Sequence, residues 1–225
     1  MGKIDRKSIK VLWVSLVKFP PLCEHLGETI PAHCGWMYSS AKALLRMMPE
    51  VRLGVMVYSY GRSYERYEID GVTYYLIPTG RIDRTSKKQI ETCRRAIRDF
   101  APDLMHIHGT EHSLAKAACV ANENGTRMVA NIQGLAGPYM RYADGGLSLW
   151  NKWTNITPLD FYRGTFLLNA KRNFKHRAEC ENYVLTYITD IVGRTQWDCD
   201  HVMTVNPRLR YLFMNETLRD SFYEV

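Results

Sequence analysis

Short apolar runs alternate along the chain with longer segments in which apolar residues recur every three or four positions. Several runs carry apolar residues at consecutive positions, which is typical of strands buried on both faces of a parallel sheet. We predict six such strands, at residues 10–16, 52–58, 72–77, 104–108, 127–132 and 187–192. Residues 61–71, between the second and third strands, are too polar for a core helix and predict a loop with a short antiparallel excursion.

The segments between the strands predict helices. These span residues 39–48, 86–100, 113–122, 159–174 and 177–186, and a further helix begins near Gln196. Pro49 and Pro102 act as stop signals behind two of them. Residues 133–157 predict instead a long loop, and loops of this length are usually functional or disordered. Its tyrosines and tryptophans argue against disorder.

Strands that alternate with helices predict right-handed β-α-β units. The expected fold class is therefore α/β, a Rossmann-like, doubly wound and mostly parallel sheet flanked by helices. The chain has 225 residues, of which 46% are hydrophobic, which suits a single large globular domain or, alternatively, a domain with an appendage. Ligands of such sheets bind outside the carboxyl ends of the strands. Site residues are therefore expected directly behind each strand.

The formal net charge is +7, but the basic residues are scattered. Small clusters occur only at Lys87-Lys88, at Arg94-Arg95 and around Lys171-Arg172 and Lys175. We interpret them as solvated helix faces, with contact to an anionic membrane surface as the next alternative. No recognised nucleic-acid motif accompanies the charge, so no nucleic-acid partner is expected.

Six cysteines are present without a C-x-x-C pair, and no signal peptide precedes the first strand, which predicts a reduced, cytoplasmic protein. No apolar run approaches the roughly 20 residues that span a bilayer, so any membrane contact is expected to be peripheral. Cys23, His25, His33 and Cys34 lie near one another, but their spacings match no common zinc site. No metal is therefore expected.

The loop behind the first strand has Gly27 midway and Gly35 beside the next helix. A glycine at a helix start lets backbone amides approach a bound anion; alternatively it only permits the turn. The loop contains neither G-x-G-x-x-G nor G-K-[ST], which argues against a nicotinamide-dependent enzyme.

The fourth strand ends in two histidines one residue apart. His106 and His108 point to the same face because side chains alternate along a strand. His106 lies deeper and is expected to be structural. His108 is followed by Gly109, so its ring is expected to face the crevice, where it could bind a sugar hydroxyl or polarise a reacting group; the alternative is a second core histidine. Thr110 and Glu111 form the turn into the next helix.

Two further strand ends carry candidate cleft residues. Gln133 and Gly134 follow the fifth strand. Behind the sixth, Arg194 could face a phosphate or pair with a carboxylate, and Thr195 is expected to cap the next helix, with Asp198 in its first turn.

The strand ends together carry a family resemblance. "PDLMHIHGTEHS", "ANIQGL", "VGRTQWDCDHVMTVNP" and "NETLRDSFYE" resemble the N-terminal half of family-4 glycosyltransferases, above all bacterial members that build surface polysaccharides. These are retaining enzymes of the GT-B fold, in which two Rossmann-like domains face each other across a cleft. The N-terminal domain mainly holds the acceptor and the C-terminal domain the nucleotide-diphosphate sugar. The resemblance implies that residues 1–225 are the N-terminal domain, without its donor-binding partner domain.

The resemblance also implies roles for particular residues. His108 matches the active-site histidine of the family, and Gly35 and Trp36 occupy the place that runs near the donor diphosphate. Many relatives have two glycines there, whereas this chain has one glycine and a tryptophan. Glu216 and Glu224 have the spacing of the family's C-terminal glutamate pair, but they lack its surrounding glycines, and we interpret the match as coincidence.

The expected reaction moves a sugar from a nucleotide-diphosphate sugar to a glycan or lipid-linked acceptor, with no cofactor and no essential metal. Residues 1–225 alone are expected to be inactive. The lipid-linked acceptors of many relatives suggest peripheral contact with the inner face of the membrane. The alternative is a non-catalytic subunit or binding module of a split glycosyltransferase.

Overall fold

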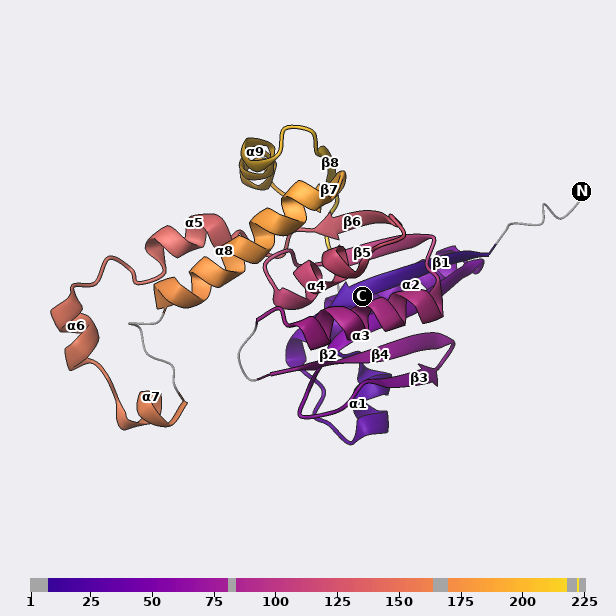
Figure 1. Ribbon diagram of the computed structural model, residues 1–225, viewed down its shortest axis with the longest axis horizontal. Helices are drawn as coiled ribbons and strands as arrows, with labels where there is room; N and C mark the ends of the chain where they lie inside the picture. Colours follow the sequence, from indigo (N-terminus) through magenta and orange to yellow (C-terminus); the bar gives the residue numbers. More distant parts are fainter. Residues whose placement is uncertain (1–7, 81–83, 164–169, 218–221, 223–225) are drawn as a thin grey trace, which may run out of the picture.

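The computed structural model describes residues 8–80, 84–163, 170–217 and Phe222. Its centre is one sheet in the order β3-β4-β2-β1-β5-β6-β7-β8 (Figure 1). The strands are β1 (Ile9–Ser15), β2 (Val51–Tyr60), β3 (Glu65–Ile69), β4 (Val72–Thr79), β5 (Leu104–His108), β6 (Arg127–Asn131), β7 (Asp190–Gly193) and β8 (Arg210–Phe213). All neighbouring pairs are parallel except β3 and β4. The predicted α/β, Rossmann-like fold class is confirmed.

Helices connect the strands. They are α1 (Pro20–Leu26), a 3₁₀ turn (Ala32–Cys34), α2 (Gly35–Met47), α3 (Lys87–Phe100), α4 (Ser113–Ala121), α5 (Ala136–Tyr142), α6 (Leu149–Thr154), α7 (Pro158–Arg163), α8 (Ala170–Tyr187) and α9 (Gln196–Val205). No helix in the described ranges is long and apolar enough to cross a membrane.

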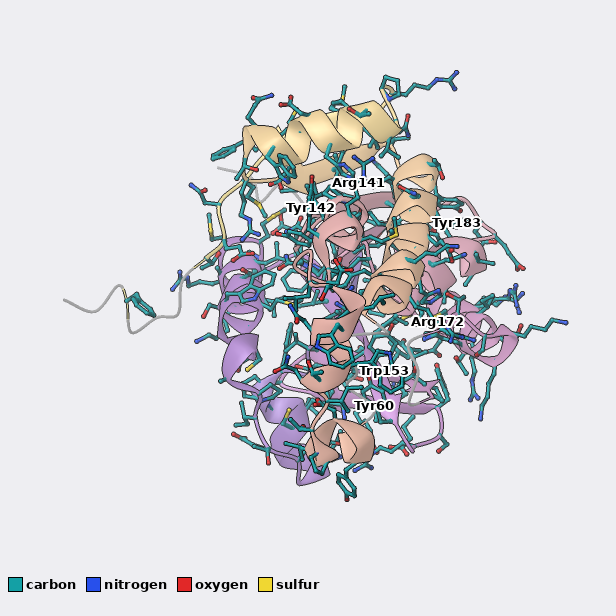
Figure 2. All side chains as sticks on the ribbon, turned by 90° about the vertical axis from the view of Figure 1, so that its left-hand side faces the viewer. Tyr60, Arg141, Tyr142, Trp153, Arg172 and Tyr183 are labelled. Carbon is teal, nitrogen blue, oxygen red and sulfur yellow. The ribbon has the colours of Figure 1, made fainter. Side chains whose placement is uncertain are left out.

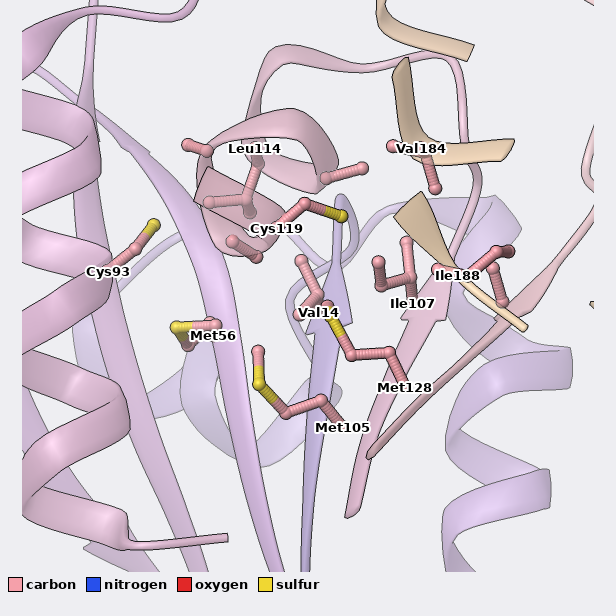
Figure 3. Packing of buried hydrophobic residues seen from close by; sticks show 14 of the residues in the cluster. Val14, Met56, Cys93, Met105, Ile107, Leu114, Cys119, Met128, Val184 and Ile188 are labelled. Atoms are coloured by element: carbon pink, nitrogen blue, oxygen red, sulfur yellow. The ribbon is translucent and has the colours of Figure 1, made fainter. Parts of the chain in front are cut away.

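The core has two layers, one on each face of the sheet, because alternate residues of a strand point to opposite faces. On β1, Leu12 and Val14 belong to the cluster that α3, α4 and α8 cover. Val11 and Trp13 belong to the other, which α1 and α2 cover. Figure 3 shows the first cluster, in which methionine, cysteine and branched aliphatic side chains meet between strands and helices.

The strand order reverses at β1. From β1 the chain proceeds through β2 to β4 in one direction, and from β5 to β8 in the other. In sheets of this kind the loops behind the two strands at such a reversal separate, and ligands bind outside the carboxyl ends of these strands; we call this place, at the ends of β1 and β5, the crevice. In Figure 1 these ends face left, toward α5, α6 and α7.

Most predicted strands lie where the apolar pattern places them. The excursion expected within residues 61–71 is β3, which pairs antiparallel with β4. The last predicted strand begins later than residue 187, at Asp190, because Tyr187 still belongs to α8. The structure adds α1, which starts on Pro20 and Pro21; proline is favoured in the first turn of a helix although it breaks a helix elsewhere. It also adds the short edge strand β8.

The prediction of a loop over residues 133–157 is wrong, because this segment contains α5 and α6. Helices of six or seven residues complete too few turns for a period of 3.6 to become visible. The helix expected over 159–174 corresponds to α7 and the start of α8, and residues 164–169 lie outside the described ones. The break expected between 174 and 177 is absent, since α8 runs through it.

Candidate functional site

Three aromatic rings meet at the crevice between β1 and β5. Trp13 is the partner of His106 in the parallel register, and His108 follows two residues later on the same face. The Trp13 ring centroid lies 4.4 Å from that of His108 and 5.8 Å from that of His106, while the two histidine rings are 4.0 Å apart. The crevice floor is therefore a packed aromatic cluster.

The two histidines have different environments. His106 Nε2 lies 2.8 Å from Asn131 Oδ1, a hydrogen bond that agrees with the structural role expected of this residue. Burial lowers the pKa of His106, although the hydrogen bond to Asn131 opposes the shift. His106 is therefore a neutral imidazole, held by the last residue of β6.

His108 is buried more completely than the sequence indicates. Its side chain is only 5% exposed, with Trp13 against it and the Trp36 ring centroid at 6.1 Å, so the ring that was expected to face the crevice is covered by these two tryptophans. Both ring nitrogens lack a hydrogen-bond partner among the described residues. Burial, and to a smaller extent the neighbouring His106, hold the pKa of His108 well below its usual value. A neutral imidazole with two unused nitrogens can both donate and accept a hydrogen bond.

The turn behind β5 brings further polar groups to the same place. Gly109 has φ of +92°, a backbone conformation that side chains disfavour, and its amide donates to the Asn131 carbonyl at 3.0 Å. A Cβ at this glycine would lie 3.4 Å from Glu111 Oε2 and 3.6 Å from Gln133 Cγ. The loops behind β5 and β6 are thus in close contact.

Several polar atoms around this turn are buried without a partner. Within the described residues they include Thr110 Oγ1, Glu111 Oε2, Gln133 Nε2 and Trp13 Nε1, besides the two nitrogens of His108. A buried polar group without a hydrogen bond costs about 1–3 kcal/mol, so such groups in native proteins usually have a water or ligand as partner. We call these five residues the crevice cluster; their unused hydrogen-bonding capacity marks a candidate binding site.

The first turn of α2 lies over the same end of β5. Gly35 has ordinary helical angles, φ −56° and ψ −48°, so the turn itself does not require a glycine. The residue before it, Cys34, makes no side-chain cap. Trp36 is half-buried and, as noted, its ring approaches His108. The structure therefore brings the rings of Trp36 and His108 together, while the expected place of both residues beside a donor group stays a prediction.

Arg194 and Thr195 lie directly before α9, which begins at Gln196. Arg194 Nη1 pairs with Glu216 Oε1 at 2.6 Å, the second of the two alternatives left open for this arginine. Thr195 is the expected N-cap: Asp198 N donates to Thr195 Oγ1 at 3.1 Å, and Thr195 N donates to Asp198 Oδ2 at 3.1 Å. Glu224 lies outside the described residues.

The remaining candidates differ in their relation to the cluster. Gly134 is half-buried, and a Cβ there would touch the Tyr139 ring at 3.7 Å, so it faces α5. Lys18, on the loop behind β1, is paired with Glu28. The crevice cluster therefore consists of neutral hydrogen-bonding groups and one carboxylate, a composition that suits hydroxyl groups better than phosphates.

No group of histidine, cysteine or carboxylate side chains in the described residues could hold a metal ion. Burial and the nearby Glu28 raise the pKa of the Cys23 thiol, which disfavours the thiolate that zinc requires. The His33 side chain lies outside the described residues. The expectation that no metal is needed stays a prediction.

Two residues at the site, Trp13 and Asn131, do not follow a strand and were therefore not predicted from the positions behind the strands. Trp13 lies within β1, two residues before its end, and Asn131 is the last residue of β6, in register with His108. The alternation along β1 identifies the face of Trp13, but only the strand order shows that this face meets the histidines.

No family model matches the sequence, and no curated protein matches it. Among solved structures the chain is similar to a sucrose-phosphate synthase from Thermosynechococcus elongatus (7% identity, TM-score 0.48, 91% of this chain and 47% of the other). It is also similar to an enzyme described as a UDP-N-acetylglucosamine 2-epimerase from Listeria monocytogenes (12% identity, TM-score 0.38, 88% and 42%). A third is the UDP-forming alpha,alpha-trehalose-phosphate synthase from Burkholderia xenovorans (12% identity, TM-score 0.43, 88% and 44%). The chain spans less than half the length of each, and likenesses this distant determine neither its activity nor its substrate.

Proposed function

We propose that this chain is the acceptor-side, N-terminal domain of a retaining GT-B glycosyltransferase. The enzyme moves a sugar from a nucleotide-diphosphate sugar to a glycan or lipid-linked acceptor in surface polysaccharide synthesis. The observation that carries the proposal is the crevice cluster, a set of buried polar atoms without partners at the point where the strand order reverses. The sequence motifs that resemble family-4 glycosyltransferases lie at these same strand ends.

The chemistry of the cluster favours a sugar over other ligands of Rossmann-like domains. A sugar presents several hydroxyl groups, each of which donates and accepts hydrogen bonds, and the neutral imidazole of His108 and the amide of Gln133 match this pattern. A dinucleotide is disfavoured, since the loop behind β1 lacks the glycine fingerprint.

In this proposal the donor diphosphate lies near Gly35 and Trp36, at the N-terminus of α2, and is held mainly by a second, C-terminal domain. Backbone amides at the helix start supply part of the positive potential that a diphosphate needs, so no metal is essential. The reaction takes place in the cytoplasm, with the enzyme at the inner face of the membrane.

A glycosyltransferase assay on the protein together with its donor-binding domain tests this function. A panel of nucleotide-diphosphate sugars is offered with glycan and lipid-linked acceptors, with and without EDTA. His108→Phe keeps a ring against Trp13 but removes both nitrogens, and we expect it to lower kcat by about 100-fold or more. EDTA is expected to leave transfer unchanged.

His25→Phe is the matched control, because His25 is exposed on α1. We expect this variant to retain full activity. Equal activity of His108→Phe and the parent protein would show that His108 has no role in the reaction. Binding of a sugar nucleotide without transfer to any acceptor would support the non-catalytic module instead.

A further inference from the structure

The segment between β6 and β7 forms an arm that projects from the carboxyl edge of the sheet. It consists of α5, α6 and α7, residues 136–163, and the first half of α8 lies beside α5 (Figure 1). Figure 2 looks at this side of the molecule, with Arg141, Tyr142, Trp153 and Arg172 all on it. We call these three helices the arm.

The arm exposes large apolar side chains that a globular surface normally covers. Trp150 is 75% exposed, Trp153 64% and Tyr142 77%. The other exposed residues of this kind on the arm are Tyr139, Leu147, Leu149, Leu159 and Tyr162. A concentration of exposed apolar residues on one segment indicates a binding surface, whereas single ones need no explanation.

The carboxylates of the arm are used within it. Asp144 and Lys152 are both buried and form an ion pair of 2.6 Å that joins the end of α5 to α6. Asp160 Oδ2 accepts hydrogen bonds from the amide and hydroxyl of Thr157, at 2.9 and 2.7 Å. Among the described residues, neither carboxylate pairs with Arg141, Arg172 or Lys175.

Three basic residues, one on the arm and two on α8 beside it, line one groove. Arg141 on α5 faces Arg172 and Lys175 on α8, with Met140 as the fourth lining residue. No carboxylate of the described residues pairs with any of the three. Residues 136–178 hold seven Lys and Arg but two Asp and Glu, so positive charge accumulates on this side of the chain.

The arm is attached firmly to the domain. Glu181 of α8 is fully buried, and its carboxylate accepts hydrogen bonds from the amides of Ala136 and Gly137 at 2.7 and 3.0 Å. His201 Nε2 of α9 lies 3.2 Å from the same carboxylate. The first turn of α5 is thereby fixed to two helices of the domain, so the groove between α5 and α8 is preformed.

We propose that the arm is a docking surface for anionic phospholipid membranes. Tryptophan and tyrosine are enriched at the boundary between headgroups and acyl chains, and each Lys or Arg near an anionic surface contributes about 1 kcal/mol. Trp150, Trp153 and Leu149 insert at this boundary, and the groove of Arg141, Arg172 and Lys175 binds headgroup phosphates. Nucleic acid would match the charge and the aromatic rings but would leave the exposed leucines without partners.

The surface of the arm carries the inference, which deepens the membrane contact that the proposed function includes. A docked arm also fixes the orientation of the domain relative to the membrane. The arm leaves the sheet at the carboxyl end of β6, the same edge as the crevice cluster, so a docked arm brings that edge toward the membrane.

Vesicle co-flotation of the purified protein tests the proposal. The probes are phosphatidylcholine vesicles with and without phosphatidylglycerol, at low and high salt. We expect binding only to the anionic vesicles and weaker binding at high salt. The variant Trp150→Ala/Trp153→Ala and the variant Arg141→Gln/Arg172→Gln/Lys175→Gln are each expected to weaken binding by about tenfold or more.

Matched controls separate the arm from general charge and hydrophobicity. Trp197→Ala removes an exposed tryptophan from α9, and Lys87→Gln/Lys88→Gln removes two exposed cations from α3. Both are expected to bind like the parent protein, and circular dichroism checks that every variant is folded.

Four results overturn the proposal: no vesicle binding, equal binding to neutral vesicles, equal loss in the control variants, or unchanged binding in the arm variants. Tighter binding to a single-stranded oligonucleotide than to anionic vesicles would assign the arm to nucleic acid. A dimer in light scattering that Trp150→Ala/Trp153→Ala converts to a monomer, without vesicle binding, would assign it to a second copy of this chain. Activity is not measured, so failure here removes the membrane contact from the proposed function and leaves the sugar transfer to its own assay.

Discussion

The ring of His108 lies against the ring of Trp13, with centroids 4.4 Å apart and planes inclined by 54°. The two residues are 95 positions apart in the sequence and meet because β1 and β5 are neighbours in the sheet. Trp13 thus forms one wall of the place where the family resemblance puts the reacting histidine. Several measurable properties depend on this contact and on the groups around it.

Trp13→Ala is expected to lower the free energy of unfolding by about 3–5 kcal/mol, because Trp13 is 3% exposed and its loss leaves a cavity beside His108. Urea denaturation followed by circular dichroism measures the change. Trp197→Ala, at an exposed position, should change stability by no more than about 0.5 kcal/mol. Equal effects of the two substitutions would contradict the packed crevice floor.

Stability should fall as the pH is lowered from about 7 to about 5. The pKa of His106 and, more strongly, that of His108 are lowered in the folded protein, while histidine in an unfolded chain titrates near 6.5. Below that pH the unfolded state binds protons that the folded state does not, so protonation favours unfolding. The loss is at most about 2 kcal/mol per histidine at pH 5.

Urea denaturation at a series of pH values measures this loss. Glu111 and His112, whose side chains lie 3.2 Å apart in the turn behind β5, place other ionisable groups beside His108. The informative quantity is therefore the difference in pH dependence between a His108 variant and the parent protein. His108→Phe should give a shallower dependence on pH than the parent protein. An unchanged slope would show that His108 is not held in its neutral form.

Gly109→Ala should destabilise the protein by about 1–3 kcal/mol and disturb the crevice cluster. The position has φ of +92°, beyond the left-handed helical region that an alanine can adopt, whereas the new Cβ would meet Glu111 Oε2 only at van der Waals distance, 3.4 Å. Gly27→Ala is the matched control, since Gly27 also has positive φ, +66°, but an added Cβ meets nothing within 4 Å. We expect its cost to be about 1 kcal/mol, from the backbone alone. Thermal unfolding compares the two, and a larger loss in Gly27→Ala would contradict the greater backbone strain expected at Gly109.

Glu181→Gln should loosen the arm. The Glu181 carboxylate accepts hydrogen bonds from two backbone amides at the start of α5. The side-chain amide of glutamine accepts more weakly because it is neutral, and its NH₂ group would face one of these backbone N–H donors without being able to bond to it. Hydrogen exchange of residues 136–142 should accelerate by about tenfold, whereas exchange in β1 and β5 should change little. Glu179→Gln, at an exposed carboxylate on the same helix, is the control. Unchanged exchange in Glu181→Gln would separate this residue from the position of the arm.

The amino-acid sequence by itself determined most of the strands, most of the helices and the fold class. Those features depend on local patterns: consecutive apolar residues in buried strands, and stop signals such as Pro102 behind α3. The N-cap Thr195 could be recognised for the same reason, because its partner Asp198 is three residues away. The two histidines of β5 also follow from alternation along a single strand.

The tertiary structure alone decided what these residues touch. Arg194 meets Glu216, and Trp13 covers His108, because the fold joins segments distant in the chain. The short helices of the arm could not be recognised, since six or seven residues show too little periodicity and Glu181, which fixes the first of them, follows some 45 residues later. The unpaired nitrogens of His108 exist only where β1, α2 and β5 converge, so burial at the crevice is a property of the assembled fold.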